Sequence, residues 1–224
     1  MNNKQQPTPN FSQEESDKQP IYRIGLTGGI STGKTTVSHY LDRGHHLPIL
    51  DADIYAREAV DRNSPILIKI VKRYGPEVLL PDKTLHRKTL GDIVFAHPDE
   101  KKWLEAQIHP YVRDRFVSEL GTLNATIAVL VIPLLFEADM TNFVNSIWVV
   151  SCSPEQQLQR LCDRDRLTPE QAQSRINSQI PLSQKIAAAN SVLDNSSTVE
   201  NLLHQVDSAL KSIPYPFNKF NINY

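Results

Sequence analysis

The chain has 224 residues, of which 40% are hydrophobic, and a formal net charge of −1. This length suits one domain with a substantial core, and the balanced charge gives no sign of a nucleic-acid surface. No stretch approaches the roughly 20 apolar residues of a membrane span, and two cysteines, Cys152 and Cys162, make no disulfide framework or metal site. We therefore expect a cytoplasmic protein that binds neither nucleic acid nor membrane.

The two ends of the chain differ in composition from the part between them. Residues 1–20 are polar and lack the apolar core of a signal peptide, so we expect a disordered N-terminal extension. Residues 213–224 read as a C-terminal tail that carries aromatic side chains. One domain is therefore expected over residues 21–212.

A glycine-rich loop follows the first predicted strand, residues 21–26, and precedes a segment of helical periodicity. Its Gly28, Gly33, Lys34 and Thr35 satisfy G-x-x-x-x-G-K-[ST], and the strand before it and the helix after it argue against a simple turn. Such a loop turns its N–H groups toward an anion at the positive end of the helix. We expect Lys34 to reach the ATP phosphates and Thr35 to ligate Mg²⁺. The predicted nucleotide contacts are Gly28, Gly29, Ile30, Ser31, Thr32, Gly33, Lys34, Thr35 and Thr36.

Two aspartates come directly after the second predicted strand, residues 46–50. Ligands of α/β sheets bind at the carboxyl ends of the strands, so both carboxylates are expected to face the phosphate loop. For Asp51 two interpretations stay open, a cap of the following helix or a group of the site. Asp53 is the predicted carboxylate that orients an acceptor hydroxyl and accepts its proton.

The rest of the chain alternates between the two hydrophobic periods. Helical patterns cover residues 54–60, 65–74, 88–120, 154–165, 168–178 and 197–212, and His109-Pro110 is expected to end one helical turn and begin another. Apolar runs predict strands at 126–132, 146–150 and 190–193. This order predicts a doubly wound α/β fold with a parallel sheet, a helical substrate-binding insertion at about 62–120 and a helical lid at about 154–180.

Basic side chains gather in and after the predicted lid: Arg160, Arg164, Arg166, Arg175 and Lys185. In a kinase, lid arginines neutralise the charge that develops on the transferred phosphoryl group. The other interpretation is a solvated helix face whose arginines pair with Asp163 and Asp165. The sequence leaves both open.

Taken together, these segments resemble the dephospho-coenzyme A kinase family, a family of P-loop kinases. The resemblance covers about residues 21–212. The matching segments, in the family's order, are 26–35 (LTGGISTGKT), 50–53 (LDAD), 85–87 (LHR), 93–96 (IVFA), His109-Pro110, 133–137 (PLLFE), Arg160 with Arg164, Arg175 with Gln179, and 192–195 (VLDN).

The resemblance implies phosphorylation of the ribose 3′-hydroxyl of dephospho-coenzyme A by ATP with Mg²⁺, in a monomer or weak homo-oligomer. It implies that Asp53 is the base and Arg164 the lid arginine, beside Lys34 and Thr35 of the phosphate loop. The family's helical acceptor-binding region matches at Arg87 and His109, and its adenine side at Asn195.

This sequence departs from the family pattern at a few positions. Ser31 and Thr32 stand where the family usually has Gly and Ser, and a side chain at 31 restricts the backbone while leaving the N–H groups in place. Asn190 stands for an Asp and Ser197 for a Gly on the adenine side.

Two other functions share features of this sequence. A nucleoside monophosphate kinase would share the phosphate loop and use a nucleotide acceptor. A P-loop switch protein is disfavoured, because residues 218–221 (NKFN) lack the terminal Asp of a guanine-reading motif and the strand ending at Ile132 runs into Pro133 instead of a metal-binding Asp.

Overall fold

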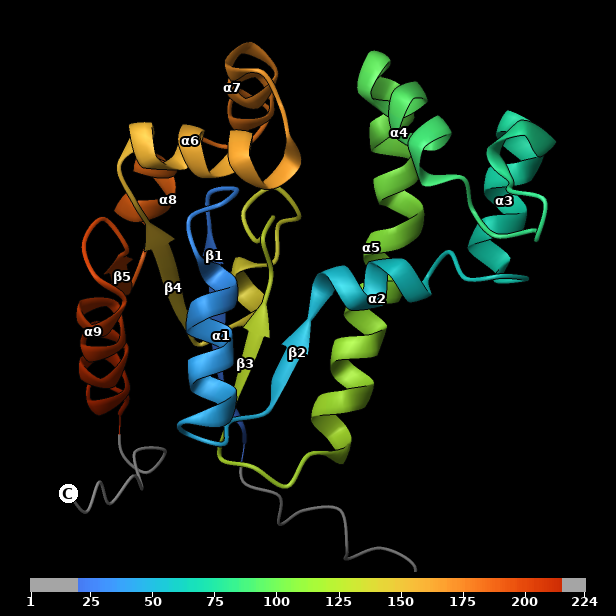
Figure 1. Cartoon of the computed structure of the whole chain (residues 1–224). Helices are drawn as coiled ribbons and strands as arrows, with labels where there is room; N and C mark the ends of the chain where they lie inside the picture. Colours follow the sequence, from blue (N-terminus) through green and yellow to red (C-terminus); the bar gives the residue numbers. More distant parts are fainter. Residues whose placement is uncertain (1–19, 215–224) are drawn as a thin grey trace, which may run out of the picture.

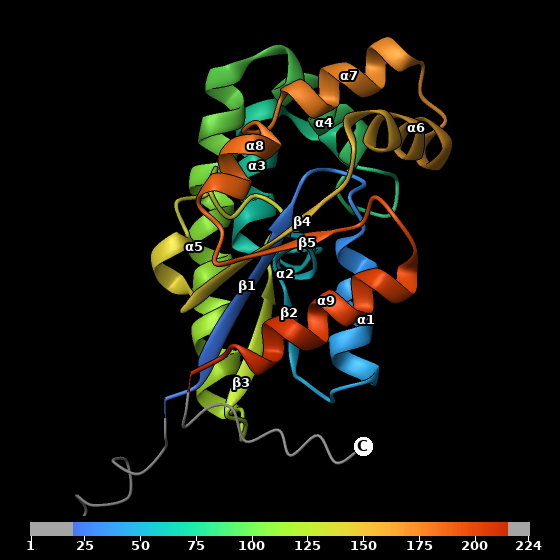
Figure 2. The ribbon, with the colours of Figure 1, turned by 90° about the vertical axis from the view of Figure 1, so that its left-hand side faces the viewer.

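The computed structural model describes residues 20–214, so the predicted N-terminal extension and most of the tail lie outside the described part. Its centre is a parallel sheet in the order β2-β3-β1-β4-β5 with helices on both faces (Figures 1 and 2). The strands are β1 (Tyr22–Gly28), β2 (Ile49–Asp51), β3 (Ile127–Val131), β4 (Ser146–Ser151) and β5 (Ser191–Asp194). The predicted doubly wound α/β fold is confirmed.

The described helices follow the predicted order, with differences at their ends. They are α1 (Lys34–Arg43), α2 (Ala52–Glu58), α3 (Pro65–Tyr74), α4 (Arg87–Ala96), α5 (Pro98–Thr122), α6 (Pro154–Asp165), α7 (Pro169–Asn177), α8 (Leu182–Ala187) and α9 (Val199–Lys211), with short 3₁₀ turns at Pro76–Val78 and Thr141–Phe143. The six-residue α8 was not predicted, because it is too short to show a helical period. None of the helices between residues 20 and 214 is long and apolar enough to cross a membrane.

Each face of the sheet has its own hydrophobic core. On one face, α1 and α9 pack through Val37 and Val206 against strand residues such as Leu26. On the other face, Phe116 of α5 and Tyr55 of α2 pack edge to face, with ring centroids 5.1 Å apart. Figure 2 shows α9 and α1 on the side of the sheet opposite to α5. Both faces are covered, which explains why the central strands read as continuous apolar runs.

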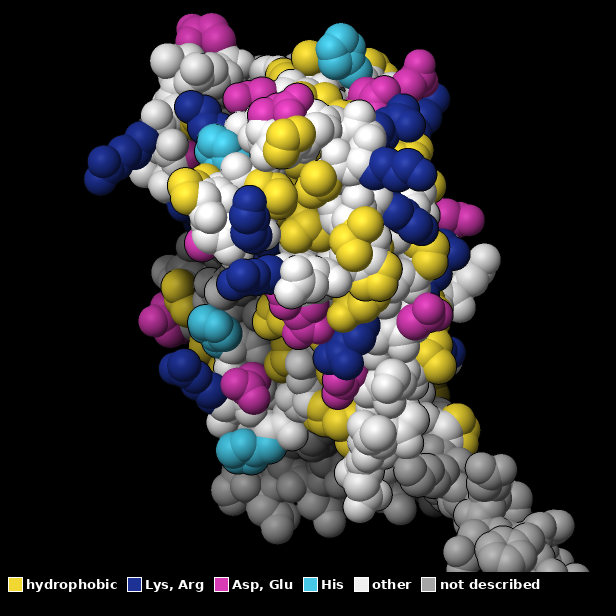
Figure 3. Space-filling model, turned by 90° about the vertical axis from the view of Figure 1, so that its right-hand side faces the viewer, with side chains coloured by type: hydrophobic (Ala, Val, Ile, Leu, Met, Phe, Trp, Pro, Cys, Tyr) yellow, Lys and Arg dark blue, Asp and Glu magenta, His cyan; other side chains and the backbone are white. Residues whose placement is uncertain are grey.

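The connection from β2 to β3 contains α2, α3, α4 and α5 and has a third core, built around buried side chains such as Ile70, Val78 and Leu90. In Figure 1 these helices extend to the right of the sheet. Figure 3 views this side, where hydrophobic side chains lie among lysines and arginines at the surface. Only the C-terminal half of α5 covers the sheet, so this helix joins the insertion to the sheet.

Two sequence predictions in this region were wrong. The helix predicted over residues 88–120 is broken at His97, which has an extended backbone (φ −131°, ψ 101°) because Pro98 disfavours the helical conformation of the residue before it. Pro110, in contrast, ends no turn and lies inside the continuous α5. Pro110 has no N–H group for the carbonyl of Ala106, four residues earlier in the helix. Both residues are exposed, so water can hydrate this carbonyl.

The second strand is shorter than predicted and lies later. It covers Ile49–Asp51, while His46 has a positive φ of 53° that no strand accommodates. Pro48 lacks an N–H group for a strand ladder and contributes only its carbonyl, to the N–H of Val129 at 2.9 Å. As a result Asp51 is the last residue of β2, and Asp53 lies in the first turn of α2.

Candidate active site

The phosphate loop connects β1 to α1 through close backbone contacts. Gly28 has a φ of 149°, and a side chain there would collide with the carbonyl of Val150. Gly33 has a φ of 106°, and a side chain there would collide with the amide of Asn195. Ser31 takes a φ of 59° where the family usually has glycine, so the loop keeps its left-handed turn in spite of the substitution.

The loop and helix α1 are arranged to receive an anion. No described side chain caps α1, which leaves its first N–H groups available at the positive end of the helix dipole. Lys34 Nζ donates to the carbonyls of Gly29 at 2.7 Å and Gly28 at 3.3 Å. Burial and, as a smaller effect, repulsion from Lys185 lower the pKa of Lys34 to about 8. A bound phosphate would relieve this repulsion, so the loop fits the polyphosphate of ATP.

The same end of α1 fits a magnesium ion. The Thr35 residue is exposed in the first turn, Asp51 ends strand β2, and Asp53 lies in the first turn of α2. Residues 20–214 contain no cluster of three acidic, histidine or cysteine side chains at metal-binding distance. Mg²⁺ is usually held by one or two protein oxygens together with substrate phosphates and water, so the donors present suit an ion that arrives with the nucleotide.

The two aspartates have different roles in the structure. Asp51 is the N-cap of α2, and its Oδ1 accepts the N–H of Asp53 at 2.8 Å, which confirms the capping interpretation. The Asp53 side chain lines a pocket instead. Burial raises the pKa of Asp53, and the nearby Asp51 charge raises it further by a smaller amount. The positive charges of Arg57 and Lys34 lower it in part. Asp53 is still exposed to water, which moderates these effects.

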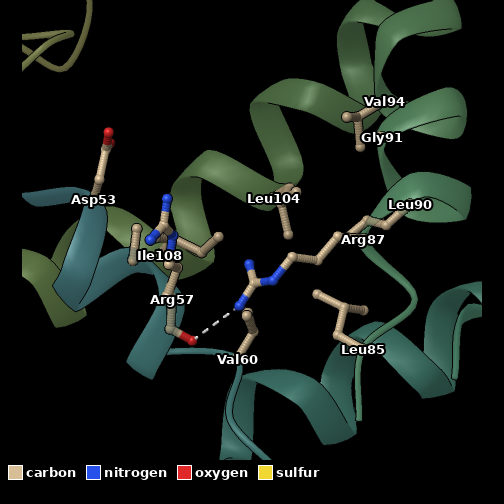
Figure 4. A pocket seen from close by; sticks show the side chains of 11 residues that line it. Asp53, Arg57, Val60, Leu85, Arg87, Leu90, Gly91, Val94, Leu104 and Ile108 are labelled. Atoms are coloured by element: carbon tan, nitrogen blue, oxygen red, sulfur yellow. Dashed lines mark hydrogen bonds between the residues drawn. The ribbon is translucent and has the colours of Figure 1, made fainter. Parts of the chain in front are cut away.

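The pocket next to Asp53 has a volume of about 360 Å³ and lies between α2, α4 and α5 (Figure 4). Asp53, Arg57 and Arg87 provide its polar groups, and Arg87 Nη2 reaches across to the carbonyl of Arg57 at 3.5 Å. The apolar part of the wall is formed by Val60, Leu85, Leu90, Val94, Leu104 and Ile108. An acceptor with an anionic part and a long apolar part suits this lining.

Of the acceptor residues predicted from the sequence, the structure brings Arg87 to this pocket together with Asp53. His109 lies on α5 next to the lining residue Ile108 but is not itself part of the lining. Burial lowers the pKa of His109. Arg57 was missed, although its position one helical turn after Asp53 could have indicated it.

The basic residues of the predicted lid fall into two groups. Arg164 at the end of α6 makes two hydrogen bonds to Asp165, at 2.8 and 3.1 Å, and Arg175 of α7 contacts the same carboxylate at 2.9 Å. Arg164 lies near enough to the phosphate loop to lower the pKa of Lys34. Arg160 points elsewhere, to the carbonyl of Asn195 at 3.1 Å. The ion-pair interpretation is therefore confirmed for Arg164 and Arg175 through Asp165, and a role of Arg164 in the transfer stays a prediction.

Asn195 follows β5 and is buried against the phosphate loop, where its Nδ2 donates to the carbonyl of Thr32 at 2.9 Å. Asn190 accepts the N–H of Ile147 through Oδ1 at 2.7 Å. A carboxylate at 190 would accept the same bond, so this departure from the family pattern leaves the pairing of β4 and β5 intact.

A fully buried lysine lies behind Lys34. Lys185 of α8 is 2.8 Å from Glu137 Oε1, and the N–H of Ile180 donates to the same oxygen at 3.0 Å. Glu137 belongs to the loop after β3. This pair joins the end of the predicted lid to that loop, and Lys185 adds positive charge beside the phosphate loop. The sequence showed Lys185 as one of several basic residues without indicating its burial.

Comparison with known proteins identifies the family. The family model described as dephospho-CoA kinase matches residues 22–201. A dephospho-CoA kinase of Trichormus variabilis is 63% identical over 187 residues, which cover 84% of this chain and 95% of the relative. The chain belongs to the dephospho-CoA kinase family. The resemblance seen in the sequence is thereby confirmed.

Two further dephospho-CoA kinases and one other solved structure resemble this chain in sequence or in fold. The enzyme of Synechocystis is 52% identical over 194 residues, covering 86% of this chain and 96% of the relative. The solved dephospho-CoA kinase of Campylobacter jejuni superposes with a TM-score of 0.63 at 27% identity, covering 84% of this chain and 95% of that one. TT1252 from Thermus thermophilus superposes with a TM-score of 0.76 at 32% identity, covering 88% and 100%.

Proposed function

We propose that this chain transfers a phosphoryl group from ATP to the ribose 3′-hydroxyl of dephospho-CoA, the last step of coenzyme A biosynthesis. The observation that carries this proposal is the position of Asp53. Its side chain lines the acceptor pocket, and its charge acts on Lys34 of the phosphate loop. One carboxylate therefore borders both the donor and the acceptor side.

In this proposal Asp53 orients the acceptor hydroxyl and takes its proton late in the transfer. Lys34 leaves the carbonyls of Gly28 and Gly29 to contact the ATP phosphates. Arg164 neutralises charge on the transferred group from the lid side. A magnesium ion, held by the Thr35 hydroxyl together with the nucleotide, would supply charge neutralisation of the phosphate oxygens.

On the acceptor side, Arg57 and Arg87 are the cations of the pocket, and we assign them to the diphosphate of dephospho-CoA. The apolar wall suits the remainder of this long molecule. Asn195 supports the nucleotide side through the carbonyl of Thr32. His109, outside the lining, is assigned a supporting role in α5 only.

The test is an assay of ADP release with ATP, Mg²⁺ and one acceptor at a time. Dephospho-CoA should stimulate release strongly, while AMP and other nucleoside monophosphates should not, and the product should carry a new 3′-phosphate by ³¹P NMR. ADP release at the same rate without any acceptor would indicate a switch protein that hydrolyses its nucleotide, and it would contradict this proposal. Preference for a nucleoside monophosphate would favour the rival kinase class.

A further inference from the structure

Ile30, at the tip of the phosphate loop, is held at both of its backbone polar groups by side chains from the lid. Its N–H donates to Gln179 Oε1 at 3.0 Å, and its carbonyl accepts from Gln157 Nε2 at 2.9 Å. Gln157 lies in the first turns of α6, and Gln179 follows the end of α7. The two glutamines therefore stand at the two ends of the lid and meet at one residue.

The packing around Gln157 shows that this contact is built into the loop. Gln157 is only 5% exposed although it is a polar side chain. A side-chain carbon on Gly29 would lie 2.5 Å from Gln157 Nε2, so the glycine at this position makes room for the glutamine. The carbonyl of the same Gly29 is the closest partner of Lys34. The Gln157 contact therefore adjoins the residue that holds the phosphate-binding lysine.

Arg164 lies on the chain between the two glutamines. Both ends of the segment from residue 157 to residue 179, which includes most of α6 and all of α7, are bonded to Ile30. These two bonds fix the ends of the segment against the phosphate loop, and within the segment Asp165 orients the Arg164 guanidinium. Neither glutamine needs to touch the nucleotide for this, because they bond Ile30 while the N–H groups that follow it remain for phosphate.

We propose that Gln157 and Gln179 are positioning residues that join the two ends of the lid to Ile30 and so place Arg164 at the transferred phosphoryl group. This proposal rests on the proposed function. It assigns a role in the transfer to two residues that act through the lid and make no contact with the reacting atoms.

The two glutamines have opposite hydrogen-bonding roles, which provides a sharp test. Gln179 accepts a bond from an N–H group, so a glutamate at 179 keeps the acceptor. Gln157 donates to a carbonyl, so a glutamate at 157 loses the donor and places a carboxylate against the carbonyl oxygen. Both exchanges add the same charge near the same residue. Gln179→Glu should therefore retain most of the activity while Gln157→Glu should not.

The kinetic experiment uses the full chain with ATP and dephospho-CoA. Gln157→Leu and Gln179→Leu each leave one peptide group of Ile30 without a partner, and each should lower kcat about 10-fold, which corresponds to about 1.4 kcal/mol. The KM for ATP should change less than kcat. Gln159→Leu and Gln173→Leu are matched controls, because these exposed glutamines bond only neighbours on their own helices, Asp163 and Asn177. Both controls should keep wild-type kinetics.

A double-mutant cycle with Arg164→Ala separates positioning from a purely structural effect. If the glutamines act through Arg164, the exchange Gln179→Leu should cost little once Arg164 is gone. Independent, multiplicative losses would overturn the proposal, as would equal behaviour of Gln157→Glu and Gln179→Glu.

Amide hydrogen exchange of Ile30 keeps the test independent of the activity. Its amide should be protected in the unaltered protein and in Gln179→Glu, and it should exchange faster in Gln179→Leu. Fast exchange in the unaltered protein would overturn the contact itself. Absence of transfer to dephospho-CoA by the unaltered protein, with Ile30 protected, would instead count against the proposed function.

Discussion

The exchange of Asp53 for asparagine is expected to separate substrate binding from chemistry. An amide at 53 can hydrogen-bond the acceptor hydroxyl but cannot take its proton, so turnover should drop by about 10² to 10⁴, which is the usual effect of removing a general base. The KM for both substrates should stay near its original value. These parameters follow from steady-state kinetics at saturating Mg²⁺.

The structure also predicts how stability responds. The pKa of Asp53 is raised in the folded protein, so the folded state holds this proton more tightly than the unfolded state does. The stability contributed by the protonated form is therefore lost as the pH rises from the unfolded pKa through the folded one. At neutral pH Asp53→Asn should unfold no more easily than the original protein. A less active variant of unchanged or higher stability would exclude misfolding as the cause.

Asp51 provides the matched comparison because it caps α2 next to Asp53. Asparagine caps a helix about as well as aspartate, so Asp51→Asn should fold normally. Burial is the larger cause of the raised pKa of Asp53 and the Asp51 charge adds to it, so removal of this charge should move the acidic limb of the kcat profile to lower pH. Asp51→Ala should lose the cap at a cost of about 1 kcal/mol, a fall in Tm of about 2 to 4 °C.

Retained turnover in Asp53→Asn together with lost turnover in Asp51→Asn would contradict the assignment of Asp53 as the base. In that case the acceptor base is Asp51, and the pocket beside Asp53 does not hold the reacting hydroxyl. An acidic limb that does not move in Asp51→Asn would show that the limb belongs to another group.

Four further predictions concern the cations of the site. Lys34→Ala should stay folded and lose about 10² to 10³ in turnover. In the unaltered protein, ATP binding at about pH 8.5 should be accompanied by uptake of protons. The reason is that the pKa of Lys34 is about 8 without nucleotide and that bound phosphate should raise it. Calorimetry in buffers of different ionisation enthalpy checks this, and uptake that persists in Lys34→Arg would assign the proton elsewhere. Arg164→Lys, which loses the planar fork, should lower turnover more than ATP affinity; equal losses in kinetics and nucleotide titration would limit Arg164 to ground-state binding. Lys185→Met leaves Glu137 without its buried cation, so the free energy of unfolding, measured with denaturant, should fall by about 3 kcal/mol. Adding Glu137→Gln to this variant should recover part of the loss. No recovery would mean that Lys185 acts by packing alone.

The phosphate loop and the order of helices and strands could be predicted because their signals are local. The loop pattern spans eight residues, and the periods of apolar side chains identify each element separately. The predictions failed where an element was too short to show a hydrophobic period, or where a proline interrupted an element that the period had predicted. Examples are the six-residue α8, the break at His97 before Pro98, and the late start of β2 after Pro48.

The sequence by itself determined the phosphate-binding loop, the aspartates after β2 and, through the order of its motifs, the family. Only the tertiary structure decided that Asp51 caps α2 while Asp53 belongs to the pocket lining, and that Lys185 is buried near Lys34. The glutamines that hold Ile30 lie 127 and 149 residues from it along the chain. No local pattern encodes such a pairing, because it exists only once the parallel sheet has brought the ends of β1 and β4 side by side.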